Sequence, residues 1–191
     1  MHEAGTPSPT ISRVMKLPEM EVLSMLAFDD SLYVSPSCQY DLDCKTGEIG
    51  RLSLRNGDEY LGEIKRGKPH GKGTMKYRRS NTHMYIGDWV QGLKEGYGVY
   101  VWKDGDKYEG EWKKDLRHGR GSQIWDDGRS YVGEWRYHQV HGEGVAVEAD
   151  GSTYSGRWKN GHKTGIFIYT KAEQTEAQLW KRGIYIRCLS L

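Results

Sequence analysis

Residues 108–121 read YEGEWKKDLRHGRG, and this stretch decides the fold because the chain repeats it. The shared order is an aromatic residue, a glycine and a tryptophan (once an isoleucine), followed by a Gly-x-Gly pair or a remnant of it. The five copies begin at Tyr60, Tyr85, Tyr108, Tyr131 and Tyr154, which are 25, 23, 23 and 23 residues apart. A fixed period of this length is typical of a repeat array, in which each unit packs mainly on its neighbours.

Side chains within each unit alternate with a period of two. In the strand that begins at Tyr108, Gly110 and Trp112 share a face, whereas Glu109 and Glu111 take the other. Glycine on the aromatic face leaves room for rings from the adjoining strand to lie across the backbone. We therefore predict a structural ladder of rings, formed by Tyr60, Tyr85, Trp89, Tyr108, Trp112, Tyr131, Trp135, Tyr154 and Trp158.

The connections between the strands carry the strongest short hairpin signal. Asn-Gly or Asp-Gly stands two or three residues before an opening tyrosine, at positions 56–57, 104–105, 127–128 and 150–151. Each unit is then a β-hairpin, and successive hairpins continue one another. We predict an all-β fold, a single-layer twisted antiparallel β-meander of about eleven strands at ~4.8 Å spacing.

The units resemble MORN repeats, the membrane occupation and recognition nexus family. The resemblance covers residues 47–170 as a half-repeat plus five repeats. It implies the single-layer meander and an interaction role, since such arrays occur in membrane-linking proteins, cytoskeletal scaffolds and ciliary radial spokes. Some family members add a catalytic domain to the array, but the segments on either side of it are short here. We therefore expect a scaffold and no enzyme.

The array is flanked by two shorter segments. Residues 1–46 are expected to form an acidic, partly disordered extension, in which 18–28 could be a helix that packs on the array or docks a partner. Residues 171–191 are expected to cap the array, either as a short helix or as a decayed sixth repeat. Residues 1–50 carry a net charge of about −5 and residues 51–191 about +7.

Composition narrows the class of protein. Basic residues interleave with acidic ones, so nucleic acid is not an expected partner. The three cysteines form no CxxC pair, which is typical of a reducing compartment. No apolar run reaches the roughly 18 residues that span a bilayer, and no secretion signal opens the chain. We expect an intracellular protein of the cytoplasm or cytoskeleton.

Three patterns that could carry chemistry have a simpler explanation. The Gly-x-Gly pairs lie inside strands and lack the lysine of a phosphate loop, so no cofactor is expected. His70, His118 and His141 recur at turn exits, about 10 Å or more apart, which is too far for a shared metal. An acidic row is expected to be solvated rather than catalytic; it comprises Glu63, Asp88, Glu111 and Glu134.

Two surfaces are candidates for binding. The predicted partner face lies opposite the rings and comprises Val99, Val101, Ile124, Val145, Val147, Ile166 and Ile168. The alternative is that residues 1–50 or 171–191 fold over this face. The predicted lipid patch comprises Lys113, Lys114, Arg117 and Arg120.

These surfaces favour a structural scaffold whose partners are other proteins of a larger assembly or further copies of the chain. The MORN resemblance makes a cytoskeletal assembly the preferred setting, most of all the axoneme of a cilium or flagellum with its radial spokes. A membrane-associated adaptor that binds phosphoinositides or other anionic lipid is the alternative.

Overall fold

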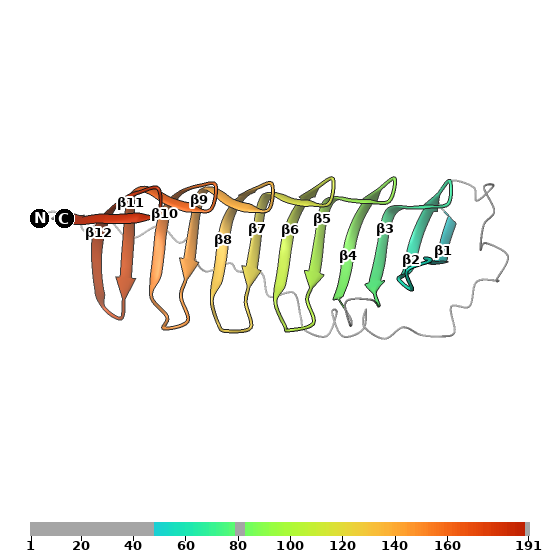
Figure 1. The fold of residues 1–191 in the computed structure, drawn as a ribbon, viewed down its shortest axis with the longest axis horizontal. Helices are drawn as coiled ribbons and strands as arrows, with labels where there is room; N and C mark the ends of the chain where they lie inside the picture. Colours follow the sequence, from blue (N-terminus) through green and yellow to red (C-terminus); the bar gives the residue numbers. More distant parts are fainter. Residues whose placement is uncertain (1–47, 79–82, 190–191) are drawn as a thin grey trace, which may run out of the picture. The chain divides into compact units, whose positions relative to one another are not determined.

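The computed structural model describes residues 48–78 and 83–189, and these form one 13-stranded antiparallel sheet. The order of the strands in the sheet is their order in the chain (Figure 1). The predicted all-β meander is confirmed, with two more strands than expected. The strands are β1 (Glu48–Ser53), β2 (Glu59–Lys65), β3 (Lys68–Tyr77), β4 (His83–Val90), β5 (Leu93–Val101), β6 (Lys107–Lys113), β7 (Leu116–Ile124), β8 (Ser130–Arg136), β9 (Gln139–Val147), β10 (Thr153–Lys159), β11 (His162–Lys171), β12 (Gln174–Lys181) and β13 (Ile184–Leu189).

The end of the chain differs from one of the two expectations. Residues 171–180 are not helical, because β12 pairs with β11 from Lys171↔Gln174 to Gly165↔Trp180, and β13 then pairs with β12. Helix propensity is worth only fractions of a kcal/mol per residue. The open edge of β11, by contrast, offers a row of backbone hydrogen bonds that a further hairpin satisfies. The expectations for residues 1–46 lie outside the described residues.

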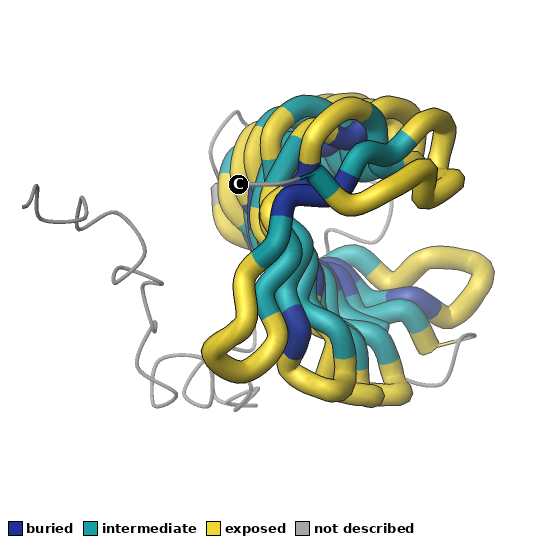
Figure 2. Tube along the Cα trace, turned by 90° about the vertical axis from the view of Figure 1, so that its left-hand side faces the viewer, coloured by how far each residue is buried: buried dark blue, intermediate teal, exposed yellow. Residues whose placement is uncertain are grey.

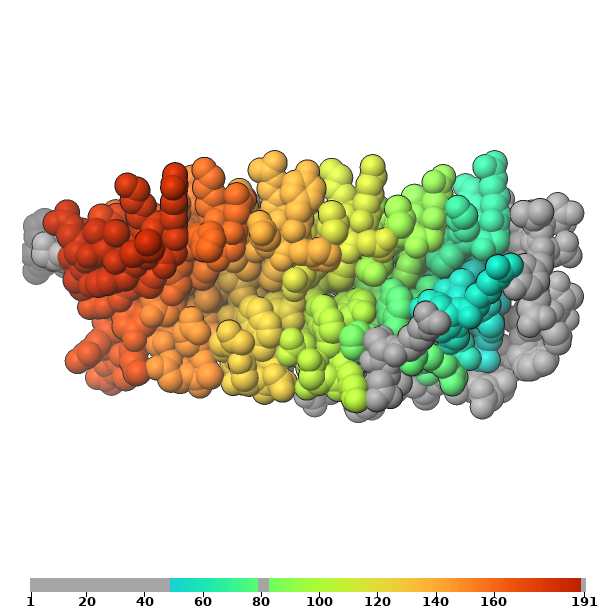
Figure 3. Space-filling view, in the orientation of Figure 1, coloured from blue at the N-terminus to red at the C-terminus, as the bar shows by residue number. Residues whose placement is uncertain are grey.

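A β-bulge occurs at the same place in every repeat. In the β6–β7 hairpin Gly110 pairs with Gly121 but Trp112 pairs with Arg117, so β7 contains two extra residues. Gly119 lies there with φ of 56°, a left-handed conformation that favours glycine. Because the bulge recurs at the same point, the hairpins bend together, as the end-on view shows (Figure 2). The space-filling view shows the hairpins side by side in chain order (Figure 3).

The core is one continuous row of aromatic rings. Neighbouring rings meet edge to face, with centroids 5.0–5.6 Å apart, and their side chains are at most 9% exposed. Edge-to-face contact is a favourable geometry for aromatic pairs. We call this set the ring row; its members, in spatial order, are Tyr60, Trp89, Tyr85, Trp112, Tyr108, Trp135, Tyr131, Trp158 and Phe167.

The polar edges of the rings bond to the backbone. The Trp112 indole N–H donates to the Gly98 carbonyl of the preceding hairpin at 3.1 Å, and the Tyr108 hydroxyl donates to the Glu111 carbonyl at 2.9 Å. The neighbouring repeats make the same bonds, so each hairpin is tied to the one before it. A side chain at Gly121 would lie 2.4 Å from the Tyr108 hydroxyl, which explains the glycine.

Tyr154 was predicted to belong to the ladder but does not lie in the ring row. Phe167 stands where the earlier repeats have their second glycine, and its ring lies over Gly156. This ring fills the place that a tyrosine occupies in the earlier repeats. Tyr154 is half-buried instead and contacts Tyr169 and Trp180, at centroid distances of 4.8 and 6.0 Å.

Candidate functional site

The face of the sheet that carries the ring row also holds cations, which the sequence analysis did not identify. The Lys94 ammonium pairs with Asp115 at 3.3 Å. It lies 5.4–5.7 Å from the centroids of four rings, those of Tyr77, Tyr85, Tyr100 and Trp112. Distances below about 6 Å allow cation–π attraction. Lys94 is therefore a structural cation enclosed by rings.

Arg117 occupies the same repeat position one hairpin later. Its guanidinium carbon lies 4.6 Å from the ring centroid of Trp135 and 5.6 Å from that of Tyr108. One of its N–H groups donates to the Gln123 side-chain oxygen at 2.7 Å. Arg117 therefore belongs to the interior of the array rather than to an exposed basic patch.

Lys163 is the third of these cations within the described residues. Its ammonium lies 2.9 Å from the ring centroid of Tyr154 and 4.5 Å from that of Trp180. Burial lowers the pKa of Lys163 to about 8. The fourth repeat has Val140 at this position, packed against the ring row. Lys94, Arg117 and Lys163 each stand two residues after a turn, and this recurring charge is the sequence signal that could have identified them.

Two of the three recurring histidines accept a backbone hydrogen bond from the turn of the next hairpin. The Gln91 N–H donates to Nδ1 of His70 at 3.5 Å, and the Asn160 N–H donates to Nδ1 of His141 at 3.3 Å. Nδ1 of His118 is buried and has no hydrogen-bond partner in the described part of the chain. In residues 48–78 and 83–189 no three His, Cys, Asp or Glu side chains are placed to hold a metal ion together.

The acidic row has a structural role that the sequence analysis did not predict. The Arg120 N–H donates to the Glu111 carboxylate at 2.8 Å, next to the bulge at Gly119. A bulge leaves a backbone N–H without its partner in the ladder, and the carboxylate supplies the acceptor. Equivalent bonds of 2.8–3.0 Å join the other acids to the residue after each bulge glycine, as Glu63–Lys72, Asp88–Tyr97 and Glu134–Glu143.

The predicted partner face lies on the side away from the ring row. Its C-terminal half is the more exposed: Val145 is 37%, Ile166 58% and Ile168 40% exposed. Val132, which the sequence analysis missed, pairs with Val145 and is 50% exposed. We call these four residues the outer aliphatic patch. Ile124 is also exposed, whereas the others of the predicted set are half-buried, namely Val99, Val101 and Val147.

The alternative that 171–191 folds over this face is wrong for the described part of that segment. Strands β12 and β13 extend the sheet edge to edge and so leave its outer face open. Ile168 pairs with Ala177 of β12, and Ile166 pairs with Leu179. The added hairpin therefore lengthens the outer face instead of covering it.

The predicted lipid patch does not gather as one surface. Lys113, Lys114 and Arg120 are exposed. Arg117, however, lies between rings on the other side of the sheet. Within the described residues no helix is both long and apolar enough to cross a membrane.

Comparison with known proteins identifies the repeats. The family model described as MORN repeat matches residues 60–82, 85–107, 108–128, 131–153 and 154–166. A stretch of 49 residues is 45% identical to MORN repeat-containing protein 3 of Xenopus laevis; it covers 26% of this chain and 20% of that protein. A stretch of 62 residues is 40% identical to ALS2 C-terminal-like protein of Homo sapiens; it covers 30% of this chain and 6% of that protein.

The matches thus span a fifth or less of these relatives. The family model matches more than half of the chain, and its first four segments coincide with the β2–β3, β4–β5, β6–β7 and β8–β9 hairpins. MORN repeats are a non-catalytic module for protein interaction or membrane association. This chain belongs to the MORN repeat family.

Proposed function

We propose that this protein is a non-catalytic scaffold that binds a partner protein through the outer aliphatic patch. The observation that carries the proposal is the exposure of four aliphatic side chains on strands β8, β9 and β11, between 37% and 58%. Contiguous apolar surface of this kind marks interaction sites, whereas apolar residues exposed singly need no explanation.

The register of the strands aligns the two halves of the patch across β10. Val132 on β8 and Val145 on β9 are cross-strand partners. On β10, Ser155 lies between Val145 and Ile168, because it pairs with both. Ser155 is small, so a partner can contact the valine pair and the isoleucines at the same time. A protein segment with an apolar face of two or three side chains, such as an amphipathic helix, fits this surface.

Charged side chains adjoin the patch. Glu143 on β9 and Arg157 on β10 form an exposed ion pair at 2.8 Å. A charged rim around an apolar centre is the usual anatomy of a protein interface. Such rim charges fix the orientation of a partner more than they add affinity.

The proposed setting is a cytoskeletal assembly, and within that class the axoneme of a cilium or flagellum. The support is the family, whose arrays occur in such assemblies, together with the physics of a single-layer sheet. The array exposes apolar side chains, and Ile184 and Ile186 on the last described strand are 67% and 49% exposed. Permanent neighbours would bury both the patch and this strand.

The patch is tested by purifying the tagged full chain from its native cells and identifying the proteins that accompany it. The double variant Val145→Asp with Ile168→Asp is expected to lose its main partner. Val90→Asp is the matched control, because Val90 is 44% exposed on the same face but lies outside the patch. An unchanged set of partners in the double variant would contradict the proposed site.

The setting is tested separately by extracting cells with detergent. A scaffold of the axoneme is expected to stay with the extracted cytoskeleton and to exchange slowly. If the protein is diffuse in the cell and leaves with the soluble fraction, the cytoskeletal assignment is wrong. That result would not affect the family assignment or the proposed patch, and it would favour a transient adaptor.

Membrane association is the second candidate, and the exposed pair Lys113 and Lys114 favours it. Each basic residue near an anionic bilayer is worth about 1 kcal/mol, so two give weak binding. Vesicles that contain phosphoinositide are expected to recruit little protein at physiological salt. Strong recruitment that Lys113→Glu with Lys114→Glu abolishes would reverse the order of the two candidates.

A further inference from the structure

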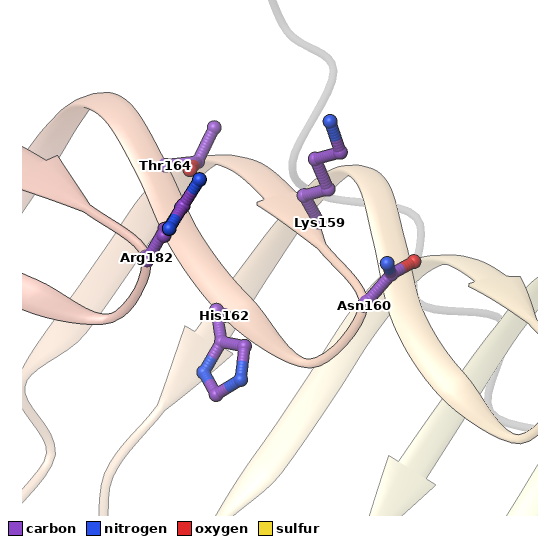
Figure 4. A pocket seen from close by; sticks show the side chains of 5 residues that line it. All are labelled: Lys159, Asn160, His162, Thr164 and Arg182. Carbon is purple, nitrogen blue, oxygen red and sulfur yellow. The ribbon is translucent and has the colours of Figure 1, made fainter.

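A pocket of about 360 Å³ lies between the last two hairpins, at the turn edge of the array. It is lined by Lys159 and Asn160 from the β10–β11 turn region, by His162 and Thr164 from β11, and by Arg182 from the β12–β13 turn (Figure 4). It lies apart from the outer aliphatic patch, and no residue is common to both.

The pocket opens where the repeat pattern changes. In three of the four earlier hairpins a longer side chain at the corresponding position reaches the next turn and accepts one of its backbone N–H groups. His141 does so with Asn160 at 3.3 Å, and Glu95 does so with Lys114 at 2.9 Å. Thr164 occupies this position at the last junction. Its side chain is shorter than histidine or glutamate, so space remains between the two turns.

The turns themselves still dock in the usual way at this junction. The Gly183 N–H donates to the Lys163 carbonyl at 2.9 Å, as the Gly161 N–H does to the Val140 carbonyl one hairpin earlier. The hollow is therefore not a consequence of hairpins that have drifted apart. It follows from one substitution in an intact framework.

The chemistry of the lining is that of an anion site. All five lining side chains can donate hydrogen bonds, and none is acidic. Arg182 offers a planar guanidinium fork, which matches the oxygens of a phosphate, and Lys159 adds a second full charge. His162 adds a ring N–H donor. Asn160 and Thr164 complete the set with neutral donors.

We propose that this pocket binds a phosphate dianion, either inorganic phosphate or the phosphate of a monoester. A pocket of about 360 Å³ is at the lower end of the size range of small-molecule sites. It accommodates one tetrahedral anion with part of its attached group. The proposal is independent of the proposed partner protein, since it rests on other residues.

Binding is tested by recording the phosphorus-31 NMR signal of inorganic phosphate, and separately that of O-phosphoserine, while the full chain is added. Sodium chloride keeps the ionic strength constant throughout the titration, because screening alone weakens the attraction between exposed charges. Saturable binding is expected at millimolar phosphate. Binding of both compounds assigns the site to monoesters, and binding of inorganic phosphate alone assigns it to the free ion.

Three variants locate the site. Arg182→Gln is expected to weaken binding roughly tenfold or more, because it removes a charge-assisted contact. Lys103→Gln removes the same charge from an exposed lysine outside the pocket and is expected to leave binding unchanged. Thr164→His restores the side chain of earlier repeats and is expected to close the pocket. The thermal midpoint of each variant shows whether the fold is kept.

Equal weakening by Arg182→Gln and Lys103→Gln would overturn the proposal, since binding would then reflect net charge alone. Absence of saturable binding to the unaltered chain would overturn it as well. Should Thr164→His fail to fold, the comparison of the two charge variants decides.

Discussion

The carboxylate of Glu111 accepts a hydrogen bond from the backbone N–H of Arg120 at 2.8 Å. The two residues lie on opposite strands of one hairpin, on either side of the bulge at Gly119. A side chain on Gly119 would lie 2.4 Å from this carboxylate. The acid, the glycine and the bulge therefore form one unit, which recurs in the four hairpins from β2–β3 to β8–β9.

Removal of this acceptor is expected to destabilise the array. Glu111→Ala leaves the Arg120 N–H without its partner, at a cost of about 1 kcal/mol for a bond at the surface. Lys113→Ala, on the same strand, is expected to stay within about 0.5 kcal/mol of the unaltered chain. Urea unfolding of the two variants measures the difference. Equal midpoints would show that the carboxylate does not support the bulge.

Gly121 is expected to be less tolerant of alanine than Gly128. The methyl group at Gly121 would meet the Tyr108 ring, and overpacking of this kind costs about 3 kcal/mol. Gly128 has open space around it and a φ of 87°, so alanine there costs only about 1 kcal/mol of backbone strain. Thermal unfolding ranks the two variants. A larger loss of stability for the Gly128 variant would mean that glycine is required more for the turn conformation than for the packing of the rings.

Phe167 is expected to matter more than Tyr154, although Tyr154 carries the repeat consensus. Phe167 is fully buried and ends the ring row, so Phe167→Ala is expected to cost about 3–5 kcal/mol. Tyr154 is half-buried beside Lys163, so Tyr154→Ala is expected to cost about half as much. Calorimetry of both variants decides the order. A larger loss with Tyr154→Ala would contradict the place assigned to Phe167.

The array is expected to lose stability as the pH rises through about 10. Burial raises the pKa of Tyr85, Tyr108 and Tyr131 above the ordinary value of 10.0. The unfolded tyrosines ionise near pH 10, whereas the folded ones stay protonated. Their contribution is therefore complete below pH 10 and decreases as the pH rises above it.

Urea midpoints measured on both sides of pH 10 check this dependence, and Tyr108→Phe is expected to make it less steep. Lys163 acts in the opposite sense, because its pKa of about 8 lets the folded state lose the proton first. Stability therefore rises with pH between about 8 and the ordinary lysine value of 10.5. A Lys163→Met background shows the tyrosine effect alone. Constant stability above pH 10 in that background would contradict the burial of the tyrosine hydroxyls.

The sequence by itself determined the repeat, the hairpins and their order in one sheet. These features depend on local rules: a fixed spacing from Tyr85 to Tyr154, alternation with a period of two, and Asp-Gly turns such as 127–128. Each rule acts within one hairpin or between adjacent hairpins. The family assignment followed from the same residues.

Only the tertiary structure decided how the hairpins bend and what the bend brings together. The bulge depends on which glycine takes the left-handed conformation, and the alternation alone does not distinguish Gly119 from Gly121. The bend then brings the Lys94 ammonium close to rings of three different repeats, and a pattern within one repeat cannot show this. Phe167 takes the place in the ring row that the repeat pattern gives to Tyr154. The space for a ring in a close-packed row depends on the neighbouring side chains, so the position of a residue in the repeat does not determine it.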